Sequence, residues 1–396
     1  MAKLLIVNNN LHIGGVQKAL VNLLWNIRDR YEITLLLFSR SGELLEELPP
    51  DIRVICPSGA WRYLGMTRDD VHSLRDRIGR AFFAAITRVF GRKYAVSLMS
   101  LGQRKYAGYD AAISYLHNSG DKVFYGGCND FVLKHVRANR KITFLHCDYL
   151  HCGADTPDNG RQYAKFDTIA ACSQGCADAF LKAHPELKER VCVVRNCQRF
   201  EKIRMEADAD PRKLAADKIN IVTVARLGKE KGVERALRVI AQLGPLRERM
   251  HYYVIGDGVQ RKLLQQIIRE ENLSEIVTLC GQKQNPYGYI KAADLLLIPS
   301  YSEAAPLVIG EAASLGTPVL STETSSAREM IEETGYGWVC KNTESDMRGA
   351  LWEMIGNQND LETQRHALLQ LCSDNTKALR DFYACIENRC HGAMKE

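Results

Sequence analysis

Short apolar runs alternate with segments of helical period along most of the chain. Continuous apolar runs of this kind are typical of parallel strands buried on both faces, and the helical segments between them are typical of crossover helices. The pattern therefore predicts an α/β fold. In the first half it predicts strands at residues 4–7, 33–38, 53–56, 111–115, 142–145, 168–171 and 192–194. In the second half it predicts strands at residues 219–224, 252–255, 277–279, 295–298 and 319–321.

The alternation lapses between residues 198 and 218, where the chain carries a charged stretch before the next strand begins. We interpret this stretch as a domain boundary. The predicted domains are residues 1–200 and 201–374, with a C-terminal helix at about 375–396 packing back on the first domain. Two such domains are expected to face a central cleft, and ligands in open α/β sheets bind beyond the carboxyl ends of the strands. The loops that follow strands are therefore the candidate sites.

Composition excludes several classes of protein. Lys and Arg number 53 against 47 Asp and Glu, and this net charge of only +6 does not indicate a nucleic-acid-binding protein. The first residues are typical of a buried strand and not of a signal peptide, and no apolar run approaches the ~20 residues of a membrane-spanning helix. Thirteen cysteines in such a chain indicate reduced thiols in a cytoplasmic protein. The densest polar cluster, residues 146–152, has no second ligand pair at suitable spacing, so no metal site is predicted.

Two loops that follow predicted strands carry groups that suit an anionic ligand. Gly14 and Gly15 end a polar loop at the start of a helix, where backbone N–H groups and the helix N-terminus favour an anion. The pair lacks the third glycine of a dinucleotide-binding fingerprint, and a plain tight turn explains it equally well. Arg226 and Lys231 flank the turn after the strand at 219–224, where two cations would stabilise a departing diphosphate. A solvated basic turn is the alternative for that segment.

The segment 299–312 carries the most specific pattern, because a loop and a helix with two carboxylates follow a buried strand. Pro306 is suited to the first position of the helix, where its missing N–H costs nothing. Glu303 is then expected in the loop and Glu311 about one and a half turns into the helix, so the two carboxylates address different parts of one ligand. Because uncompensated burial of a carboxylate is costly, Glu311 needs a polar partner, and a ribose diol would suit it.

In these segments the chain resembles glycosyltransferase family 4, the retaining enzymes with the two-domain GT-B fold. The resemblance covers nearly the whole length and is strongest from about Asn220 to Met330. It implies two Rossmann-like domains that face a central cleft, and transfer of a sugar from a nucleotide-sugar donor. The motifs that carry it stand in the right order: Gly14-Gly15, the turn from Arg226 to Gly232, Ile255-Gly256-Asp257-Gly258, Gly281, Ala293-Asp294, and Glu303 with Glu311.

The resemblance also implies roles for individual residues. Arg226 and Lys231 would bind the donor diphosphate, Glu311 the ribose hydroxyls, and Glu303 the transferred sugar. His146, just after the strand at 142–145, resembles the family's active-site histidine near the sugar; a neutral loop histidine is the alternative. The other donor-binding positions that the resemblance implies are Gly14, Gly15, Gly258, Gly281, Lys283, Ala305, Pro306 and Leu307.

The chemistry implied is displacement at the anomeric carbon, with a nucleoside diphosphate leaving through an oxocarbenium-like transition state. Because Arg226 and Lys231 can supply the positive charge, neither a metal nor another cofactor is expected. The Asp-x-Asp pattern at residues 208–210 falls in the expected linker and is discounted. Many family members have Gly and a bulky apolar residue where this chain has Ala304-Ala305, which leaves the identity of the sugar open.

The resemblance favours a UDP-hexose donor and a saccharide or lipid-linked acceptor of bacterial cell-surface polysaccharide synthesis, in the capsule and lipopolysaccharide branch. Three alternatives remain open. They are a nucleotide-sugar epimerase or a phosphorylase with the same fold, and a catalytically inactive module that binds a sugar nucleotide.

Residues 73–93 form a basic segment of helical period with Asp76 as its one acid. Such a helix suits an anionic lipid surface and predicts peripheral contact with the inner face of the cell membrane. A helix packed on the core of the first domain with a solvated basic face is the alternative. On a helical wheel the apolar face holds Ile78, Phe82, Ile86, Val89 and Phe90, and the opposite face holds Arg77, Arg80, Arg88 and Arg92.

Overall fold

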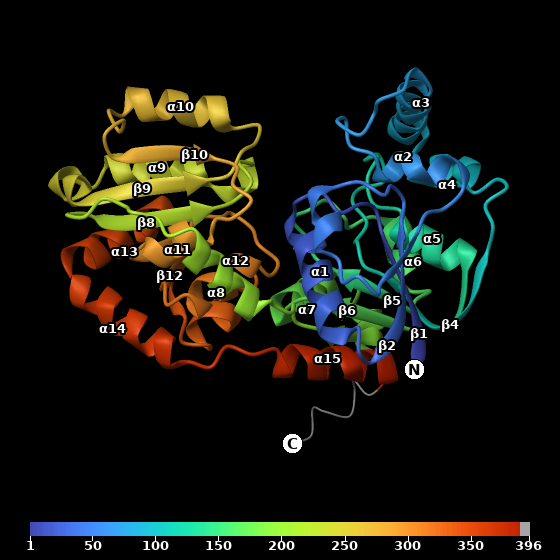
Figure 1. Ribbon diagram of the computed structural model, residues 1–396. Helices are drawn as coiled ribbons and strands as arrows, with labels where there is room; N and C mark the ends of the chain where they lie inside the picture. The colour runs from blue at the N-terminus through green and yellow to red at the C-terminus, as the bar shows by residue number, and fades with distance from the viewer. Residues whose placement is uncertain (389–396) are drawn as a thin grey trace. The chain divides into compact units, whose positions relative to one another are not determined.

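The computed structural model describes residues 1–388, which divide into two compact units (Figure 1). The N-terminal unit consists of Met1–Cys197 and the residues from Asn375 onward, and the C-terminal unit consists of Gln198–Asp374. The sequence places the boundary after residue 200, and the structure places it after Cys197. Residues 389–396 of the predicted C-terminal helix lie outside the described residues.

The N-terminal unit is built on a parallel sheet with the strand order β3-β2-β1-β4-β5-β6-β7. Leu4 and Ile6 of β1 point into the core on one face of the sheet, and Leu5 and Val7 point into the core on the other. Both faces are therefore covered, as the continuous apolar runs require. The strands are β1 (Ala2–Asn8), β2 (Tyr31–Leu37), β3 (Arg53–Ile55), β4 (Tyr106–Ser114), β5 (Val136–Leu145), β6 (Thr168–Ala171) and β7 (Val191–Val193).

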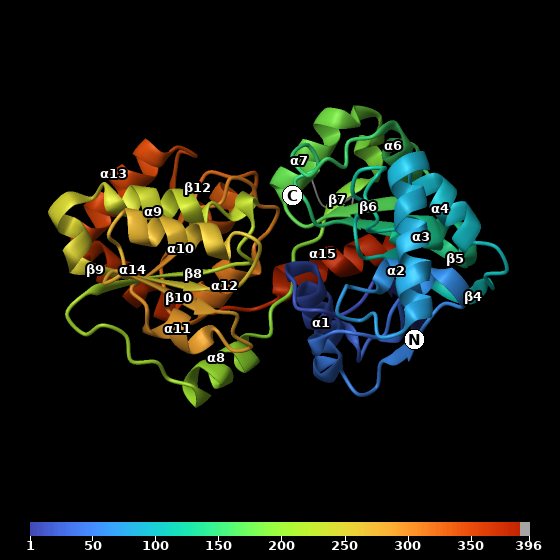
Figure 2. The same cartoon turned by 90° about the horizontal axis from the view of Figure 1, so that it is seen from above.

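Helices cover both faces of this sheet (Figure 2). Apolar residues of α1 and α15 pack on one face, and apolar residues of α4 and α5 pack on the other. The helices of the unit are α1 (Gly15–Ile27), α2 (Arg62–Gly65), α3 (Leu74–Phe90), α4 (Arg92–Met99), α5 (Cys128–His135), α6 (Pro157–Tyr163), α7 (Gln174–Ala183) and α15 (Thr376–Glu387).

The C-terminal helix α15 is an integral part of the N-terminal unit. Its Phe382 is fully buried and lies edge-on to Tyr31, with ring centroids 6.2 Å apart. The guanidinium of Arg140, on β5, donates to the carbonyl oxygens of Cys385 and Ile386 at 3.0 and 2.7 Å. These contacts cap the helix C-terminus with a positive charge, which favours its dipole.

The C-terminal unit has a second parallel sheet, with the strand order β10-β9-β8-β11-β12-β13. Its strands are β8 (Ile219–Val224), β9 (Met250–Ile255), β10 (Val277–Gly281), β11 (Leu295–Ile298), β12 (Val319–Thr322) and β13 (Gly337–Cys340). On one face lie α9 (Val233–Ala241), α10 (Arg261–Glu270) and α13 (Glu344–Gly356). On the other lie α8 (Phe200–Ala209), α11 (Tyr287–Ala292) and α12 (Leu307–Ser314), and α14 (Gln358–Gln370) follows α13.

Every strand that the sequence predicts is present, which confirms the α/β class. Two features were missed. The charged stretch interpreted as a linker contains helix α8, whose Ile203 and Ala207 are buried in the C-terminal unit. Strand β13 at the sheet edge was also missed, because its residues are only partly buried and give a weak apolar signal. Among residues 1–388 no helix combines the length and the apolar character that crossing a membrane would take.

Candidate functional site

Each sheet has a topological switch point beside its first strand. In the N-terminal unit β1 lies between β2 and β4, and in the C-terminal unit β8 lies between β9 and β11. At such a point the loops leave the carboxyl ends of neighbouring strands in opposite directions and open a crevice for ligands. Most of the residues predicted from the sequence lie in loops that follow strands of these two sheets, so we describe the two units in turn.

In the C-terminal unit, the turn after β8 presents two cations in different surroundings. The Arg226 side chain is 73% exposed, and its Nη2 donates to Glu230 Oε1 at 2.5 Å. Lys231 points to the neighbouring loop, where its Nζ lies 2.7 and 2.9 Å from the two carboxylate oxygens of Glu303. The structure therefore brings Lys231 and Glu303 together, while Arg226 remains on the surface.

The loop after β11 packs directly against this turn. Gly232 has φ +61°, and a Cβ there would lie 2.0 Å from the Pro299 carbonyl oxygen, so only glycine allows the approach. The backbone N–H of Tyr301 donates to the Glu230 carbonyl oxygen at 2.9 Å. Ser300 Oγ donates to Glu303 Oε1 at 2.7 Å, which fixes the carboxylate beside Lys231.

Arg235 holds the loop after β11 through hydrogen bonds to its backbone. The sequence analysis did not identify this residue. It is 2% exposed, and its guanidinium donates to the carbonyl oxygens of Pro299 and Ser300, each at 2.7 Å. The same group lies over the Tyr301 ring, 4.0 Å from its centroid. In the sequence, Arg235 is only a basic residue within the apolar pattern of a helix. That pattern does not distinguish a buried arginine from one exposed to solvent. Arg235 holds the shape of the loop that carries Glu303.

Helix α12 carries Glu311 into the interior of the unit, where the residue is 3% exposed. The helix begins at Leu307, so Pro306 occupies the N-cap and not the first helical position that the sequence predicts. This correction moves the proline one residue outward. Ala305 and Pro306 are half-buried at the entrance of the helix, and Leu307 is buried.

Glycines bring the remaining loops of the C-terminal unit close together. A Cβ on Gly258 would lie 2.6 Å from the Leu227 carbonyl oxygen, so the loop after β9 packs on the turn after β8. Gly281 ends β10 with φ +73°, and its carbonyl oxygen accepts from the Gly256 N–H at 2.9 Å. Lys283 follows on an exposed loop.

In the N-terminal unit, α1 begins at a glycine pair, and a Cβ on the first of them, Gly14, would lie 2.6 Å from Gln17 Oε1. Gly14 is the N-cap, with extended backbone, and no side chain caps the helix. A Cβ on Gly15 would meet nothing within 4 Å. The first N–H groups of α1 are thus not covered by a capping side chain, which is the feature that suits an anion.

The loop before this helix is held by a histidine that the sequence analysis did not single out. His12 Nε2 lies 2.9 Å from Asp70 Oδ2, and His12 Nδ1 lies 3.3 Å from Glu43 Oε2. Glu43 also accepts from the Ile13 N–H at 3.1 Å. Because Asp70 lies 58 residues after His12, the sequence spacing of the two residues did not predict their contact.

His146 lies just after β5 in aromatic surroundings. Its ring stacks on Phe144, with centroids 5.6 Å apart, and approaches Tyr115 at 4.6 Å. Burial, reinforced by His117, lowers the pKa of His146 to about 3. Its Nε2 is buried and has no hydrogen-bond partner in the structure. The ring is therefore neutral at physiological pH and can exchange a hydrogen bond with a ligand.

His117, after the adjacent strand β4, is a second histidine at this edge of the sheet and was missed. Burial lowers its pKa to about 4, and its Nδ1 is buried without a partner. Two neutral imidazoles therefore follow neighbouring strands, and the predicted site residue is one of them.

Several other features of the sequence lie outside these loops. No group of three or more His, Cys, Asp or Glu side chains in residues 1–388 could hold a metal ion. In the 146–152 cluster, His151 Nδ1 lies 3.0 Å from Asp148 instead. The discounted Asp-x-Asp pattern ends α8, where Asp208 contacts Lys291.

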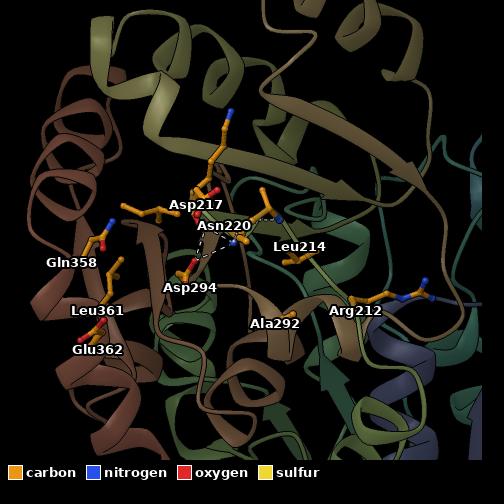
Figure 3. Close-up of a pocket in the computed structure, with 13 residues that line it drawn as sticks. Arg212, Leu214, Asp217, Asn220, Ala292, Asp294, Gln358, Leu361 and Glu362 are labelled. Atoms are coloured by element: carbon orange, nitrogen blue, oxygen red, sulfur yellow. Dashed lines mark hydrogen bonds between the residues drawn. The ribbon is translucent and has the colours of Figure 1, made fainter.

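A cavity of about 460 Å³ lies at the opposite, amino-terminal ends of β8 and β11 (Figure 3). Its wall includes Asp217, Asn220 and Asp294, and the Asn220 N–H donates to Asp294 at 2.8 Å. None of the predicted site residues lines it. Because α/β sheets bind ligands at the carboxyl ends of their strands, we assign the candidate site to the loops and not to this cavity.

Comparison with known proteins finds a family match within the C-terminal unit. A family model described as glycosyl transferases group 1 matches residues 205–365. WcaL of Escherichia coli (strain K12), a candidate glycosyltransferase of colanic acid biosynthesis, is 31% identical over 167 residues, 40% of this chain and 40% of WcaL.

A second relative is the N-acetylgalactosamine-N,N'-diacetylbacillosaminyl-diphospho-undecaprenol 4-alpha-N-acetylgalactosaminyltransferase of Campylobacter jejuni. It is 27% identical over 195 residues, 49% of this chain and 52% of that enzyme. The chain thus spans about half or less of the length of these two relatives.

The crystal structure of Anabaena HepE in complex with UDP and glucose matches 99% of both chains with a TM-score of 0.66. At 17% sequence identity this likeness shows the fold. It extends over both units, whereas the sequence match is confined largely to the C-terminal one. Residues 205–365 thus match the family model of glycosyl transferases group 1, and the chain that carries them has the GT-B fold.

Proposed function

We propose that the chain is a retaining glycosyltransferase that moves a hexose-type sugar from a nucleotide-sugar donor, with UDP-sugars favoured. The acceptor is a saccharide or a lipid-linked saccharide of bacterial cell-surface polysaccharide synthesis. The observation that carries the proposal is the pairing of Lys231 with Glu303 at the switch point of the C-terminal unit, with Glu311 buried in the helix that follows. Relatives named for colanic acid synthesis and for transfer to a diphospho-undecaprenol acceptor support the class of acceptor.

The donor diphosphate would lie between Arg226 and Lys231. Arg226 is exposed and held by one surface carboxylate, so it can turn toward a ligand. Lys231 is fixed and partly neutralised by Glu303. As the bond to the anomeric carbon breaks, negative charge grows on the leaving diphosphate, and these two cations stabilise it. We therefore propose that neither a metal nor another cofactor is required.

Glu311 would accept hydrogen bonds from the ribose hydroxyls, and Glu303 from the transferred sugar. The loop from Gly281 to Lys283 would border the base. Gly258 and the segment from Ala305 to Leu307 would contribute close backbone contacts.

In the N-terminal unit, Gly14 and Gly15 would present the uncapped amides of α1 to an anionic group of the donor. His146 would exchange a hydrogen bond with a sugar hydroxyl as a neutral ring, because burial lowers its pKa to about 3. We propose the cytoplasm as the compartment, since the described cysteines are thiols and not disulfides.

The test is hydrolysis of a panel of UDP-, GDP- and ADP-sugars by the purified chain, followed as release of the nucleoside diphosphate. We expect release from a UDP-hexose by the parent and a large loss in Glu303→Ala. Binding without release, with or without added acceptors, would indicate an inactive binding module. Release of UDP together with an epimerised sugar would indicate an epimerase. NMR of the product linkage tests retention of the anomeric configuration.

A further inference from the structure

Four cysteines lie close together at the carboxyl edge of the N-terminal sheet. Cys147 and Cys152 lie in the loop after β5, Cys172 directly follows β6, and Cys176 lies in the first turn of α7. The Cys172 and Cys176 sulfurs are 3.7 Å apart, and the Cys176 thiol donates to the Cys147 carbonyl oxygen at 3.3 Å. Of these four, Cys152 alone is exposed and the other three are buried. Cys152 therefore connects the cluster to solvent.

The turn between Cys147 and Cys152 brings their thiols together. The Cys152 N–H donates to the Asp148 carbonyl oxygen at 2.9 Å, which closes the turn. Tyr149 anchors the turn in the unit, because its side chain is fully buried and its hydroxyl lies 3.0 Å from His184 Nε2. With the turn held in this way, the Cys147 and Cys152 thiols share a hydrogen bond.

This hydrogen bond gives the two sulfurs different reactivity. The pKa of Cys152 is lowered, chiefly because the Cys147 thiol donates a hydrogen bond to it, and the Ala154 N–H adds to the effect against partial burial. The pKa of Cys147 is raised, first by the same hydrogen bond and then by burial. The thiolate is the nucleophilic form of cysteine, so Cys152 is the attacking sulfur. An accessible thiol of lowered pKa beside a second thiol is typical of cysteines that respond to oxidants.

We propose that Cys147 and Cys152 form an oxidation site, at which a hydroperoxide such as hydrogen peroxide converts the two thiols to a disulfide. The Cys152 thiolate attacks one peroxide oxygen, the O–O bond breaks, and the second oxygen leaves as hydroxide, which takes up the proton that the Cys152 thiol released. Cys152 is then a sulfenic acid. The Cys147 sulfur attacks the Cys152 sulfur, the S–O bond breaks, and the leaving hydroxide takes the Cys147 proton. Two thiols and one hydrogen peroxide thus give one disulfide and two water molecules.

The disulfide would change the loop that carries His146. Cys147 is the next residue after His146, and its backbone is held by the Cys176 thiol. A covalent bond brings the two sulfurs closer than a hydrogen bond does, so the turn at 148–152 must rearrange beside His146. This consequence rests on the proposed function, in which His146 contacts the transferred sugar. Oxidation should then lower turnover on the order of a hundredfold, as a small misplacement of a site residue does, and leave UDP affinity nearly unchanged.

Mass spectrometry of the full chain tests the oxidation without any activity. The reduced protein is treated with hydrogen peroxide, denatured, alkylated with N-ethylmaleimide and digested with trypsin. The tryptic peptide 142–161 contains Cys147 and Cys152 and no other cysteine. We expect it to become lighter by two hydrogen atoms and to escape alkylation. The peptide 166–182, with the buried Cys172 and Cys176, is the internal control and should be alkylated at both.

Three variants separate the roles of the two sulfurs. In Cys147→Ala, Cys152 should accumulate as a sulfenic acid that dimedone traps, and its alkylation should need a higher pH, because the donated hydrogen bond is gone. Cys152→Ser should give neither the sulfenic acid nor the disulfide. Cys56→Ser removes another exposed thiol of the N-terminal unit, whose pKa is raised by burial, and should form the disulfide as the parent does. If Cys147→Ala fails to fold in a melting experiment, the exposed Cys152→Ser still carries the test.

A parent whose 142–161 peptide stays alkylated at both cysteines after peroxide treatment would overturn the proposal. A disulfide between Cys172 and Cys176 in its place would do the same. Hydrolysis of the UDP-sugar is measured before oxidation, after it, and after reduction with dithiothreitol, and we expect a fall and a recovery that Cys152→Ser does not show. An unchanged rate in the oxidised parent would refute the effect on His146. If the reduced parent hydrolyses no UDP-sugar, the proposed function fails, while the peptide masses still decide whether the oxidation site exists.

Discussion

Lys231 Nζ lies 2.7 and 2.9 Å from the two carboxylate oxygens of Glu303, although 72 residues separate them in sequence. The two side chains are 23% and 10% exposed, so solvent and salt screen the pair less than a surface ion pair. The ammonium that we assign to the diphosphate and the carboxylate that we assign to the sugar are therefore in contact before any donor arrives. A bound diphosphate must share Lys231 with Glu303.

This sharing predicts opposite effects on nucleotide binding. Glu303→Ala releases Lys231 from its carboxylate, so the affinity for UDP should stay the same or rise, while turnover falls by about a hundredfold or more. Lys231→Ala should weaken UDP binding and lower turnover by roughly 100- to 1000-fold, as loss of a charge-stabilising donor does. Calorimetry and initial rates measure both. The variant with both substitutions should turn over only a little more slowly than the slower of the two single variants. Weaker UDP binding by Glu303→Ala would contradict the shared contact.

Glu311 should act through the ribose before any chemistry occurs. Glu311→Ala is expected to weaken UDP binding by roughly ten- to a hundredfold, the usual worth of a hydrogen bond to a charged group. Calorimetry with UDP and with its 2′-deoxy analogue separates this contact from a loss of packing. If the carboxylate binds the ribose diol, the parent should discriminate between the two nucleotides more strongly than the variant does. Unchanged affinity for UDP in the variant would remove Glu311 from the donor site.

His146 should contribute to turnover as a neutral ring. His146→Ala is expected to leave UDP affinity nearly unchanged and to lower turnover by about a hundredfold. Burial lowers the pKa of His146 to about 3, so His146 does not change its charge near pH 6.5. The pH–rate profiles of the parent and of His146→Ala should therefore have the same shape in that range. A pH–rate profile of parent and variant checks this. Normal turnover in His146→Ala would make the residue a structural loop histidine.

Donor binding should not require a divalent metal if Arg226 and Lys231 supply the positive charge, as we propose. Calorimetry of UDP binding with Mg²⁺ and with EDTA should give the same affinity, and Arg226→Ala should weaken binding equally in both buffers. A large loss of affinity in EDTA alone would contradict the assignment of the two cations. Arg212→Ala, on the amino-terminal side of the sheet, is the control. Its affinity for UDP in the same titration should match that of the parent.

Stability should fall as the pH is lowered below about 6.5, the usual histidine pKa. Burial lowers the pKa of His135 to about 4, with Lys134 and Lys105 adding to the effect. Between these two values the unfolded chain binds more protons than the folded one, so acid favours unfolding by up to about 1.4 kcal/mol per pH unit for one such group. Melting temperatures from pH 7 to pH 5 measure the fall. His135→Phe should make it shallower.

The strands could be predicted because burial on both faces of a parallel sheet imposes an unbroken apolar run, as at 168–171 and 295–298. Their carboxyl ends then located the loops that carry Lys231 and Glu303. Strand β13 gave no such run, because an edge strand is covered on fewer sides.

Contacts between distant loops could not be predicted, because sequence spacing carries no information about them. The support that Arg235 gives to Pro299 follows from the pairing of β8 with β11. The bond between His12 and Asp70 joins segments that lie 58 residues apart in the sequence. Helical periodicity also failed to separate the exposed arginines of α3 from Arg92, which is buried among polar partners that only the fold supplies.

The return of α15 to the N-terminal unit makes that unit discontinuous in sequence, whereas Gln198–Asp374 is one continuous segment. Phe382 and Cys385 complete the core beside Tyr31, so the N-terminal unit cannot finish its core until α15 leaves the ribosome. The second unit has all its residues earlier and can fold first, although domains usually fold in the order of synthesis. A nascent chain arrested before α15 emerges should therefore contain a completed C-terminal unit and an N-terminal unit whose core is incomplete.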